Sequence, residues 1–249
     1  MSGRAGYAFG DSALARERLE IVADTFAAPT RSLLEALPQH DARYVLDLGC
    51  GPGFTTMLLS EAFPRAWITG LDASPAMIAD AASRVPAAHF AVEDVTVPLR
   101  LPADVVYARL LLGHLRDPSS ALAHWARALR APGLLVCEEP VRYLSDNPVF
   151  RRYERDVTRV VAARGGTLWA GDVLDDELAR CTRALDRVIH HPVRLGRAAA
   201  MFWRNAATWG AEIDGADELI PYLRELESAD PPDHVIWELR QVAWVKWTG

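Results

Sequence analysis

Three acidic residues in the first half of the chain each follow a short apolar run, and glycines cluster after the first of them. Asp47 leads into the turn GCGPG at 49–53, while Asp72 and Asp94 end two later runs. Glycine permits a tight turn and a close approach of backbone to a ligand. The carboxylate of Asp47 can contact an ammonium group, that of Asp72 both hydroxyls of a ribose, and that of Asp94 an adenine amino group. Together they predict a site for an adenosyl group joined to an amino acid.

The spacing of the glycines distinguishes this site from a dinucleotide site. A G-x-G-x-x-G fingerprint aligned on Gly49 and Gly51 needs a third glycine at position 54, where the chain has Phe54. The pattern present is D-x-G-x-G-x-G. It indicates backbone packing against a ligand with no phosphate to bind.

A sheet is expected to position these residues, because apolar strands and helices alternate from residue 44 to residue 139. Such alternation is typical of a parallel sheet covered by helices on both faces. The carboxyl ends of its strands share one rim, where ligands bind in doubly wound folds, so we expect the three acids to gather there. The predicted strands are 44–49, 66–72, 89–94, 104–112 and 133–139, and the predicted helices are 54–63, 75–84 and 118–130.

Helices are expected on both sides of this alternating region. A helix at 11–28 is expected to end at Pro29, and Thr30 to cap a second short helix through Leu37. The later part of the chain is predicted as helix 148–163, a second inserted helix at 172–181, strand 187–195, helices 197–210 and 215–227, and strand 235–247.

The motifs DLGCGPG, LDASPAM, AVEDV and ARLLLGHLRDP resemble those of class I S-adenosylmethionine-dependent methyltransferases, in particular bacterial enzymes that act on small molecules and natural products. The resemblance implies an α/β fold with a doubly wound, Rossmann-like sheet of order 3-2-1-4-5-7-6 and an antiparallel strand 7. It implies an N-terminal helical lid (1–40), a cofactor core (41–140), a helical insertion with strand 6 that caps the substrate (141–210), and a last helix and strand 7 (211–249). The implied cofactor is S-adenosylmethionine, with S-adenosylhomocysteine as product and no metal.

The resemblance also implies which residues contact the cofactor. Tyr7 and Arg18 are candidates to approach its carboxylate, while Met77 is expected to pack on the adenine. Cys50 is interpreted as packing rather than as a nucleophile, because no histidine and acid in register can be identified for it. The full set of cofactor candidates is Tyr7, Arg18, Asp47, Gly49, Cys50, Gly51, Gly53, Asp72, Ala73, Met77, Asp94, Val95 and Arg109.

Two residues are candidates for catalysis. Methyl transfer from a sulfonium depends on alignment in a dry pocket, and a base is needed only where the acceptor must lose a proton. His114 follows the fourth strand and could be that base, or it could be a loop histidine that shapes the pocket floor. Glu138 and Glu139 alternate in direction on the fifth strand, and we expect Glu139 to face the substrate.

The methyl acceptor is expected to be a small molecule, either aromatic or an amine. With His114, the residues Tyr143, Trp169 and Trp203 are expected to bind it. Tryptophan side chains would suit an aromatic ring, or a cation through cation–π contact. Trp237, Trp244 and Trp247 lie in the predicted last strand, where they could simply be core.

Composition argues against several other classes of function. The net charge of −6 argues against a nucleic-acid partner, as does the absence of an Asn/Asp-Pro-Pro-aromatic turn after the fourth strand. No apolar run approaches the ~20 residues that span a bilayer, and residues 1–20 hold no apolar signal core, so we expect a cytoplasmic protein without membrane contact. The three cysteines are too far apart to indicate a zinc site.

Two alternatives to a small-molecule methyltransferase stay open. Arg151, Arg155 and Arg159 share one face of the predicted 148–163 helix, which is either solvated or a docking face for a substrate bound to a carrier or protein. The chain could also bind the cofactor in a regulatory role without methylating. The favoured prediction is O- or N-methylation in specialised metabolism by a monomer or homodimer.

Overall fold

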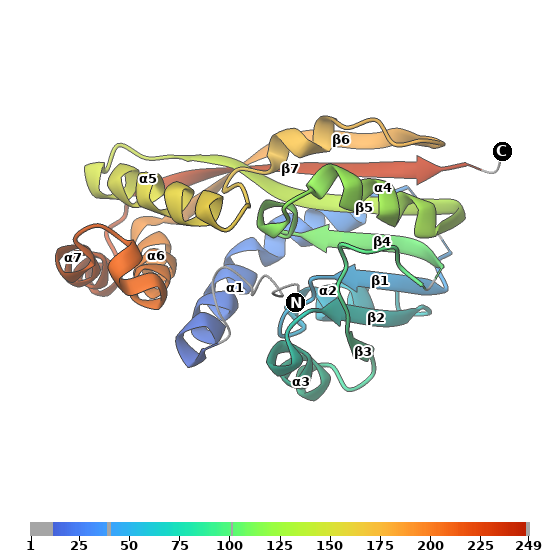
Figure 1. Ribbon diagram of the computed structural model, residues 1–249, viewed down its shortest axis with the longest axis horizontal. Coiled ribbons are helices and arrows are strands. Elements are labelled where there is room, and N and C mark those ends of the chain that lie inside the picture. The colour runs from blue at the N-terminus through green and yellow to red at the C-terminus, as the bar shows by residue number, and fades with distance from the viewer. Residues whose placement is uncertain (1–11, 39–40, 101, 248–249) are drawn as a thin grey trace.

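The computed structural model describes residues 12–38, 41–100 and 102–247. Within them, seven strands form one sheet of order β3-β2-β1-β4-β5-β7-β6 (Figure 1). β7 pairs antiparallel with β5 and β6, and the other neighbours are parallel. The predicted strand order and the antiparallel strand 7 are therefore confirmed. The strands are β1 (Tyr44–Leu48), β2 (Trp67–Asp72), β3 (His89–Val92), β4 (Ala103–Arg109), β5 (Leu129–Leu144), β6 (Cys181–Arg194) and β7 (His234–Lys246).

Three of the helices begin with the same local signal, a capping side chain followed by proline. Ser74, Asp117 and Asn147 each accept a hydrogen bond from a backbone N–H of the first turn, and the following proline supplies a preformed φ at a position with no N–H to lose. The helices are α1 (Ala13–Ala36), α2 (Phe54–Ala62), α3 (Pro75–Arg84), α4 (Pro118–Ala128), α5 (Pro148–Ala163), α6 (Leu195–Trp209) and α7 (Ala216–Ala229), with short 3-10 turns η1 (Leu112–His114), η2 (Gly171–Asp175) and η3 (Gly210–Glu212).

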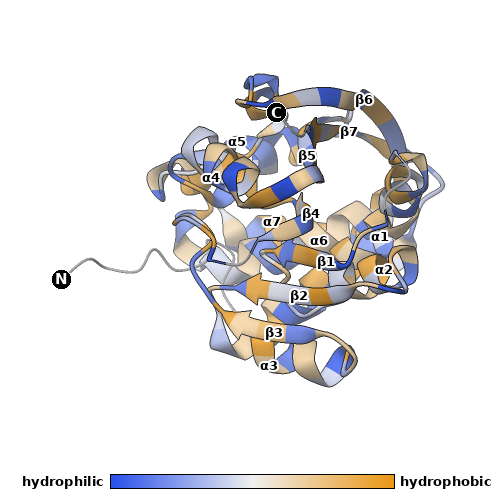
Figure 2. Cartoon of the chain, turned by 90° about the vertical axis from the view of Figure 1, so that its right-hand side faces the viewer, coloured by the Kyte–Doolittle hydropathy of each residue, from blue (hydrophilic) through white to orange (hydrophobic). Residues whose placement is uncertain are grey.

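Strand alternation gives the sheet a separate hydrophobic core on each face. Val45 and its neighbours on one face pack with Leu33 of α1 and Leu59 of α2. Leu46, one residue later, faces the opposite core, with Trp125 of α4. Figure 2 shows hydrophobic residues along the central strands, whereas along β6 they alternate with hydrophilic ones. Burying each large apolar side chain stabilises the fold by about 1.5–3 kcal/mol.

A third core lies beyond the carboxyl ends of β1, β2 and β4, where α5, α6 and α7 gather (Figure 1). It contains Phe26 of α1, Phe150 of α5, Phe202 of α6, Tyr143 of β5 and Leu239 of β7. We call this set the cap cluster. It joins the first helix to the later part of the chain, so α1 belongs to two cores at once.

The prediction that one helix ends at Pro29 and a second short helix follows is wrong, because α1 runs unbroken through Pro29. Proline has no N–H to donate to the carbonyl of Thr25, one turn earlier. The ring of His191 on β6 bonds that carbonyl instead, at 2.9 Å, and Gln241 of β7 donates to the carbonyl of Pro29 at 3.1 Å. Side chains of the sheet thus complete the helix at its proline.

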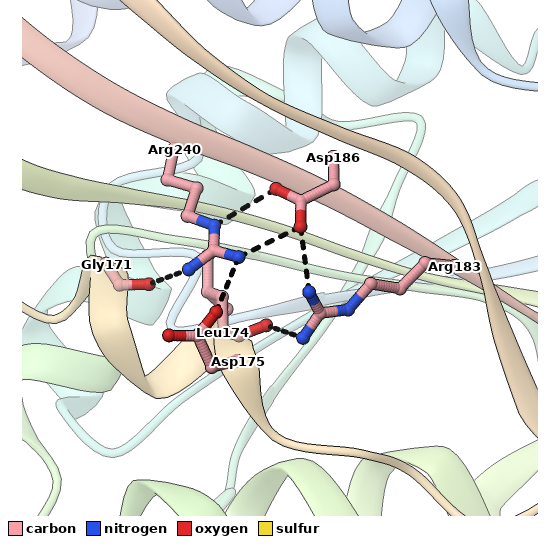
Figure 3. Close-up of polar contacts among 6 residues, drawn as sticks. All are labelled: Gly171, Leu174, Asp175, Arg183, Asp186 and Arg240. Atoms are coloured by element: carbon pink, nitrogen blue, oxygen red, sulfur yellow. Dashed lines mark hydrogen bonds and ion pairs between the residues drawn. The ribbon is translucent and has the colours of Figure 1, made fainter.

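The second inserted helix expected at 172–181 is also wrong. Only the short turn η2 forms, and β6 begins at Cys181. Arg240 of β7 holds both oxygens of Asp186 at 2.9–3.0 Å, the carbonyl of Gly171 at 3.2 Å and Asp175 at 2.8 Å (Figure 3). Arg183 donates to the same Asp186. These bonds fix η2 against β6 and β7.

Thr30 provides a test of how α1 is bound to the sheet. Its hydroxyl donates to the buried Glu138 at 2.8 Å and accepts from the partly buried Arg109 at 3.0 Å. We expect Thr30→Val, which keeps the shape, to lower the free energy of unfolding by about 1–3 kcal/mol in urea, because it leaves a buried carboxyl short of a donor. Thr158→Val is the control, since that exposed hydroxyl bonds only its own helix. Equal losses in both variants would contradict this account.

Candidate active site

Asp47 lies buried at the carboxyl end of β1. The hydroxyls of Thr55 and Thr56, in the first turn of α2, donate to its Oδ2 at 2.8 and 2.6 Å. Burial raises the pKa of Asp47 to about 6, against these two bonds and the charge of Arg109. The carboxyl is therefore mostly ionised at pH 7. Because both threonines use Oδ2, Oδ1 keeps capacity to accept from a cationic group.

The glycines of the turn differ in what surrounds them. All three have positive φ, at 61° for Gly49, 52° for Gly51 and 86° for Gly53. A side chain at Gly49 would collide with Leu111 at 2.7 Å, and one at Gly53 would press on Ala81 at 3.1 Å. A Cβ at Gly51 would meet no atom within 4 Å. The outer two glycines thus lie against neighbouring residues, whereas the middle one borders open space.

Asp72, at the end of β2, fastens this turn to the neighbouring strand. Its two carboxylate oxygens accept the N–H of Gly51 at 2.9 Å and of Ser74 at 2.8 Å. Burial raises the pKa of Asp72 and these N–H bonds oppose the rise. Each oxygen has a second acceptor position, so the carboxylate can still receive two ribose hydroxyls.

The third strand-end acid is arranged differently. Asp94 is exposed, and one of its oxygens accepts both the N–H and the hydroxyl of Thr96. Val95 is buried and its carbonyl accepts the indole N–H of Trp125 at 2.8 Å. The loop after β3 is thereby anchored to α4, which holds Asp94 at the rim.

The remaining candidates at this rim differ in exposure. Ala73 is exposed beside Asp72, whereas Met77 is buried in the first turn of α3. Cys50 is a buried residue of the glycine turn itself, and burial raises the pKa of its thiol. Because the nucleophile is the thiolate, a buried thiol with a raised pKa is unreactive, which agrees with a packing role for Cys50.

Arg109, at the end of β4, carries a charge that acts on two buried acids. It donates to Thr30, and its positive charge lowers the pKa of both Asp47 and Glu138 against the stronger effect of burial. The charge of one guanidinium thus reaches both the acid beside the glycine turn and the acid that faces α1.

Five predicted residues come together in the wall of one cavity of about 100 Å³. Arg18, His114, Glu139, Tyr143 and Trp169 line it, from α1, η1, β5 and the segment before η2. Glu138 faces the opposite side of β5, toward α1, which is the arrangement that strand alternation predicts.

Sequence reasoning missed much of this wall, which belongs to the cap cluster. Phe202 stacks on Tyr153 with ring centroids 4.3 Å apart, and Trp237 meets Phe26 edge-on at 5.5 Å. Asn205 adds one amide to the lining. The signal that was available is this amide, which interrupts the otherwise apolar buried face of α6. We call the whole lined space the aromatic cavity.

The two titratable candidates in the aromatic cavity have displaced pKa values. Burial, and secondly the charge of Arg18, lowers the pKa of His114 to about 3. Burial raises the pKa of Glu139 to about 8, although the N–H groups of Leu111 and Leu112 donate to its Oε1 at 2.7 and 2.9 Å. At pH 7 the imidazole is neutral and the carboxyl is largely protonated.

The loop after β4 joins the aromatic cavity to the glycine turn. The side chain of Leu111 lies against Gly49, while its N–H bonds Glu139 in the cavity wall. Leu110, between Arg109 and Leu111, has a φ of +53°, a left-handed conformation that costs a non-glycine residue about 1–3 kcal/mol. This strained loop connects the two halves of the site.

Other predicted residues lie apart from the cavity. Trp203 is outside its lining. Its indole donates to Glu227 at 2.5 Å, and the guanidinium groups of Arg204 and Arg224 lie over its ring at 4.2 and 4.8 Å from the centroid. Tyr7 falls outside the residues that the structure describes. Of the late tryptophans, Trp237 lines the cavity, Trp244 is core and Trp247 is exposed.

Comparison with known proteins connects this site to a family. A methyltransferase-domain family matches residues 46–135. A trans-aconitate 2-methyltransferase of Methylobacterium radiotolerans is 34% identical over 222 residues, which cover 85% of this chain and 80% of that protein. The chain belongs to the class I S-adenosylmethionine-dependent methyltransferases. A trans-aconitate 2-methyltransferase of Escherichia coli K12 is 38% identical over 125 residues, half of each chain.

Solved methyltransferases have the same fold. The geranyl diphosphate C-methyltransferase of Streptomyces coelicolor A3(2) superposes with a TM-score of 0.55 at 14% identity, covering 96% of this chain and 84% of that one. Coclaurine N-methyltransferase gives a TM-score of 0.54 at 12% identity, covering 98% and 77%.

The glycine turn of this methyltransferase fits its cofactor, S-adenosylmethionine. The open space over Gly51 would admit the amino-acid part, with Oδ1 of Asp47 available to its ammonium group, and the carboxylate of Asp72 would bind the ribose. The cofactor supplies a methyl group already activated on sulfonium. The chain's own part is to bind and align it.

Two further observations concern the part of the methyltransferase that is described. No three His, Cys, Asp or Glu side chains there are grouped to hold a metal ion. His190 and His191 point apart, one to Glu238 and the other to the α1 carbonyl. Among the described helices, none is both long and apolar enough to span a membrane.

Gly51 and Gly210 form a matched pair for testing the cofactor site. Both have a φ of +52° and no atom within 4 Å of an added Cβ. We expect alanine at either position to reduce stability by about 1–3 kcal/mol through backbone strain. Only Gly51→Ala should also weaken S-adenosylhomocysteine binding, by about tenfold or more in calorimetry, because its methyl group enters the ligand space. A similar affinity for both variants would refute the assignment of this turn.

Proposed function

We propose that this methyltransferase transfers a methyl group to an oxygen or nitrogen of a small molecule held in the aromatic cavity. The observation that carries the proposal is the loop through Leu111, which places the cavity wall against the glycine turn. In the reaction the sulfonium–methyl bond breaks as the bond to the acceptor forms, and the acceptor's proton passes to a base. The mostly aromatic wall supports an acceptor from specialised metabolism.

Glu139 and His114 are the two candidates for that base. An effective base has a pKa near the working pH. Glu139, with a pKa of about 8, meets this condition better than His114, with a pKa of about 3. We therefore assign proton removal to the Glu139 carboxylate, and to His114 a neutral hydrogen-bonding role beside the acceptor.

Methylation of a carboxylate is the second candidate function. It is favoured by the 34% identical relative, named for trans-aconitate. A carboxylate is ionised at neutral pH and needs no base, so this reaction would not depend on Glu139. The described lining of the cavity, however, holds one arginine and one buried carboxyl, which is a poor match for three negative charges.

A carrier-bound substrate receives less support from the arginine-rich helix α5. Arg152 donates to the carbonyl of Asp214, Arg159 pairs with Asp214, and Arg164 pairs with Glu212 at 2.7 Å. These arginines are bonded to the segment between α6 and α7, which favours a structural role over docking. Arg151 and Arg155, on the exposed side, are the residues that a carrier would meet.

Transfer of labelled methyl from S-adenosylmethionine to a panel of phenols, amines and carboxylates, trans-aconitate included, tests the proposal. We expect product with at least one uncharged acceptor, and loss of product with Asp72→Ala, which removes the ribose contact. Binding of the cofactor without transfer to any compound of the panel or of a cell extract would instead indicate a regulatory homologue.

The pH dependence of transfer to a hydroxyl or amine acceptor separates the two bases. If the Glu139 carboxylate is the base, kcat/KM rises about tenfold per pH unit below pH 8 and levels off above it, because only the ionised form accepts a proton. Glu139→Gln should abolish this rise and most of the activity. His114→Gln should keep the profile, because His114 is already neutral throughout. A profile lost in His114→Gln but kept in Glu139→Gln would assign the base to His114.

A further inference from the structure

Two polar atoms of residues in the cavity wall have no hydrogen-bond partner among the described residues. They are Oδ1 of Asn205, a side chain only 5% exposed, and the indole Nε1 of Trp237. One is an acceptor on α6 and the other a donor on β7. A buried polar group without a partner costs about 1–3 kcal/mol, so each calls for an explanation.

Similar groups in the same wall do have partners. The indole of Trp169 donates to Glu154 at 3.1 Å, and the hydroxyl of Tyr143 donates to a carbonyl of α5 at 2.7 Å. The amide of Asn205 itself donates to the hydroxyl of Tyr153 at 2.8 Å. Whichever way that amide is turned, one of its polar atoms bonds Tyr153 and the other has no partner among the described residues.

The size and surface of the aromatic cavity limit what could satisfy these atoms. The enclosed space of about 100 Å³ is smaller than the engineered apolar cavity of about 150 Å³ that binds benzene. It therefore suits at most one ring, and a substituent of that ring would lie toward the open side of the cavity. The rings of Phe202 and Trp237 offer faces and edges to such a ring.

The charge of the wall disfavours a ligand with several carboxylates. Among the described residues of the lining, Arg18 is the one charged at pH 7, because His114 is neutral and Glu139 is largely protonated. A ligand with several carboxylates would enter with more negative charge than one guanidinium can balance, beside a carboxyl that burial already keeps protonated.

Resting on the small-molecule methyltransferase function proposed above, we propose that Asn205 and Trp237 are specificity-determining residues for a neutral, single-ring phenol. A phenolic hydroxyl can donate to a carbonyl oxygen and accept from an indole N–H, and it suits either orientation of the amide. The ring packs against the aromatic wall, and the hydroxyl supplies the bonds that the protein does not make for itself.

The test compares p-cresol with toluene, two rings of similar size that differ by one hydroxyl, in calorimetric titrations of the S-adenosylhomocysteine-loaded protein. We expect p-cresol to bind about tenfold more tightly than toluene, as one to two net hydrogen bonds would give. Asn205→Leu should reduce this preference to about one, and Trp237→Phe should reduce it in part while retaining an aromatic ring.

Trp169→Phe is the matched control, because it makes the same change in the same wall but removes an N–H that already has a protein partner. It should keep the preference for p-cresol, whatever it does to the affinity for both rings. Melting temperatures identify variants that fail to fold. If Asn205→Leu fails to fold, the preference for p-cresol measured with Trp237→Phe tests the proposal.

Several results would overturn the proposal: equal binding of the two rings, binding of neither, or a preference unchanged in both variants. The outcome is independent of turnover. A preference for p-cresol without methyl transfer to any acceptor would support the roles of Asn205 and Trp237 and refute the proposed function. Transfer to another acceptor, with no preference for p-cresol, would support the proposed function and refute these roles.

Discussion

Two adjacent buried carboxyls on β5 impose the constraint on which the site depends. Because side chains alternate along a strand, Glu138 must face α1 and Glu139 must face the aromatic cavity. Neither can be left without donors in the interior. Thr30 and Gln241 bond the first, and the N–H groups at the start of η1 bond the second. The carboxyls therefore fix the position of α1 over one face of the sheet and the path of the loop after β4 on the other.

That loop makes cofactor binding and acceptor binding parts of one structure. Leu111 fills the space that a side chain at Gly49 would need, and its N–H holds Glu139. The strained φ of Leu110 just before it has a cost, which the bond from its own N–H to the carbonyl of Glu138 helps to offset. A shift of the glycine turn when the cofactor binds would therefore move the N–H group that bonds Glu139, the carboxyl to which we assign proton removal.

The sheet and the position of the three acids at its rim could be predicted because their signals are local. A strand-end acid, a glycine turn or a cap followed by proline is complete within a few residues. The errors arose where distant side chains decide the outcome. Pro29 is tolerated within α1 because His191 and Gln241, far along the chain, supply its missing bonds. Likewise Arg240 turns the 172–181 region into a short 3-10 turn rather than a helix. The aromatic cavity draws on α1, β5, α5, α6 and β7, so no single segment reveals it.

The arginine-rich composition also acquires a physical interpretation from the structure. Arginine provides several donors in a rigid fork and can hold more than one acceptor at once. Arg240 does so between β7, β6 and η2, and Arg164 and Arg159 do so between α5 and the segment before α7. These bonds brace the walls of the aromatic cavity from outside. Among the described lining residues, Arg18 alone brings a guanidinium into the cavity. The ion pairs of the other arginines lie outside a wall that is mostly aromatic. Such a wall suits binding of the acceptor by ring packing and a few hydrogen bonds rather than by ion pairing.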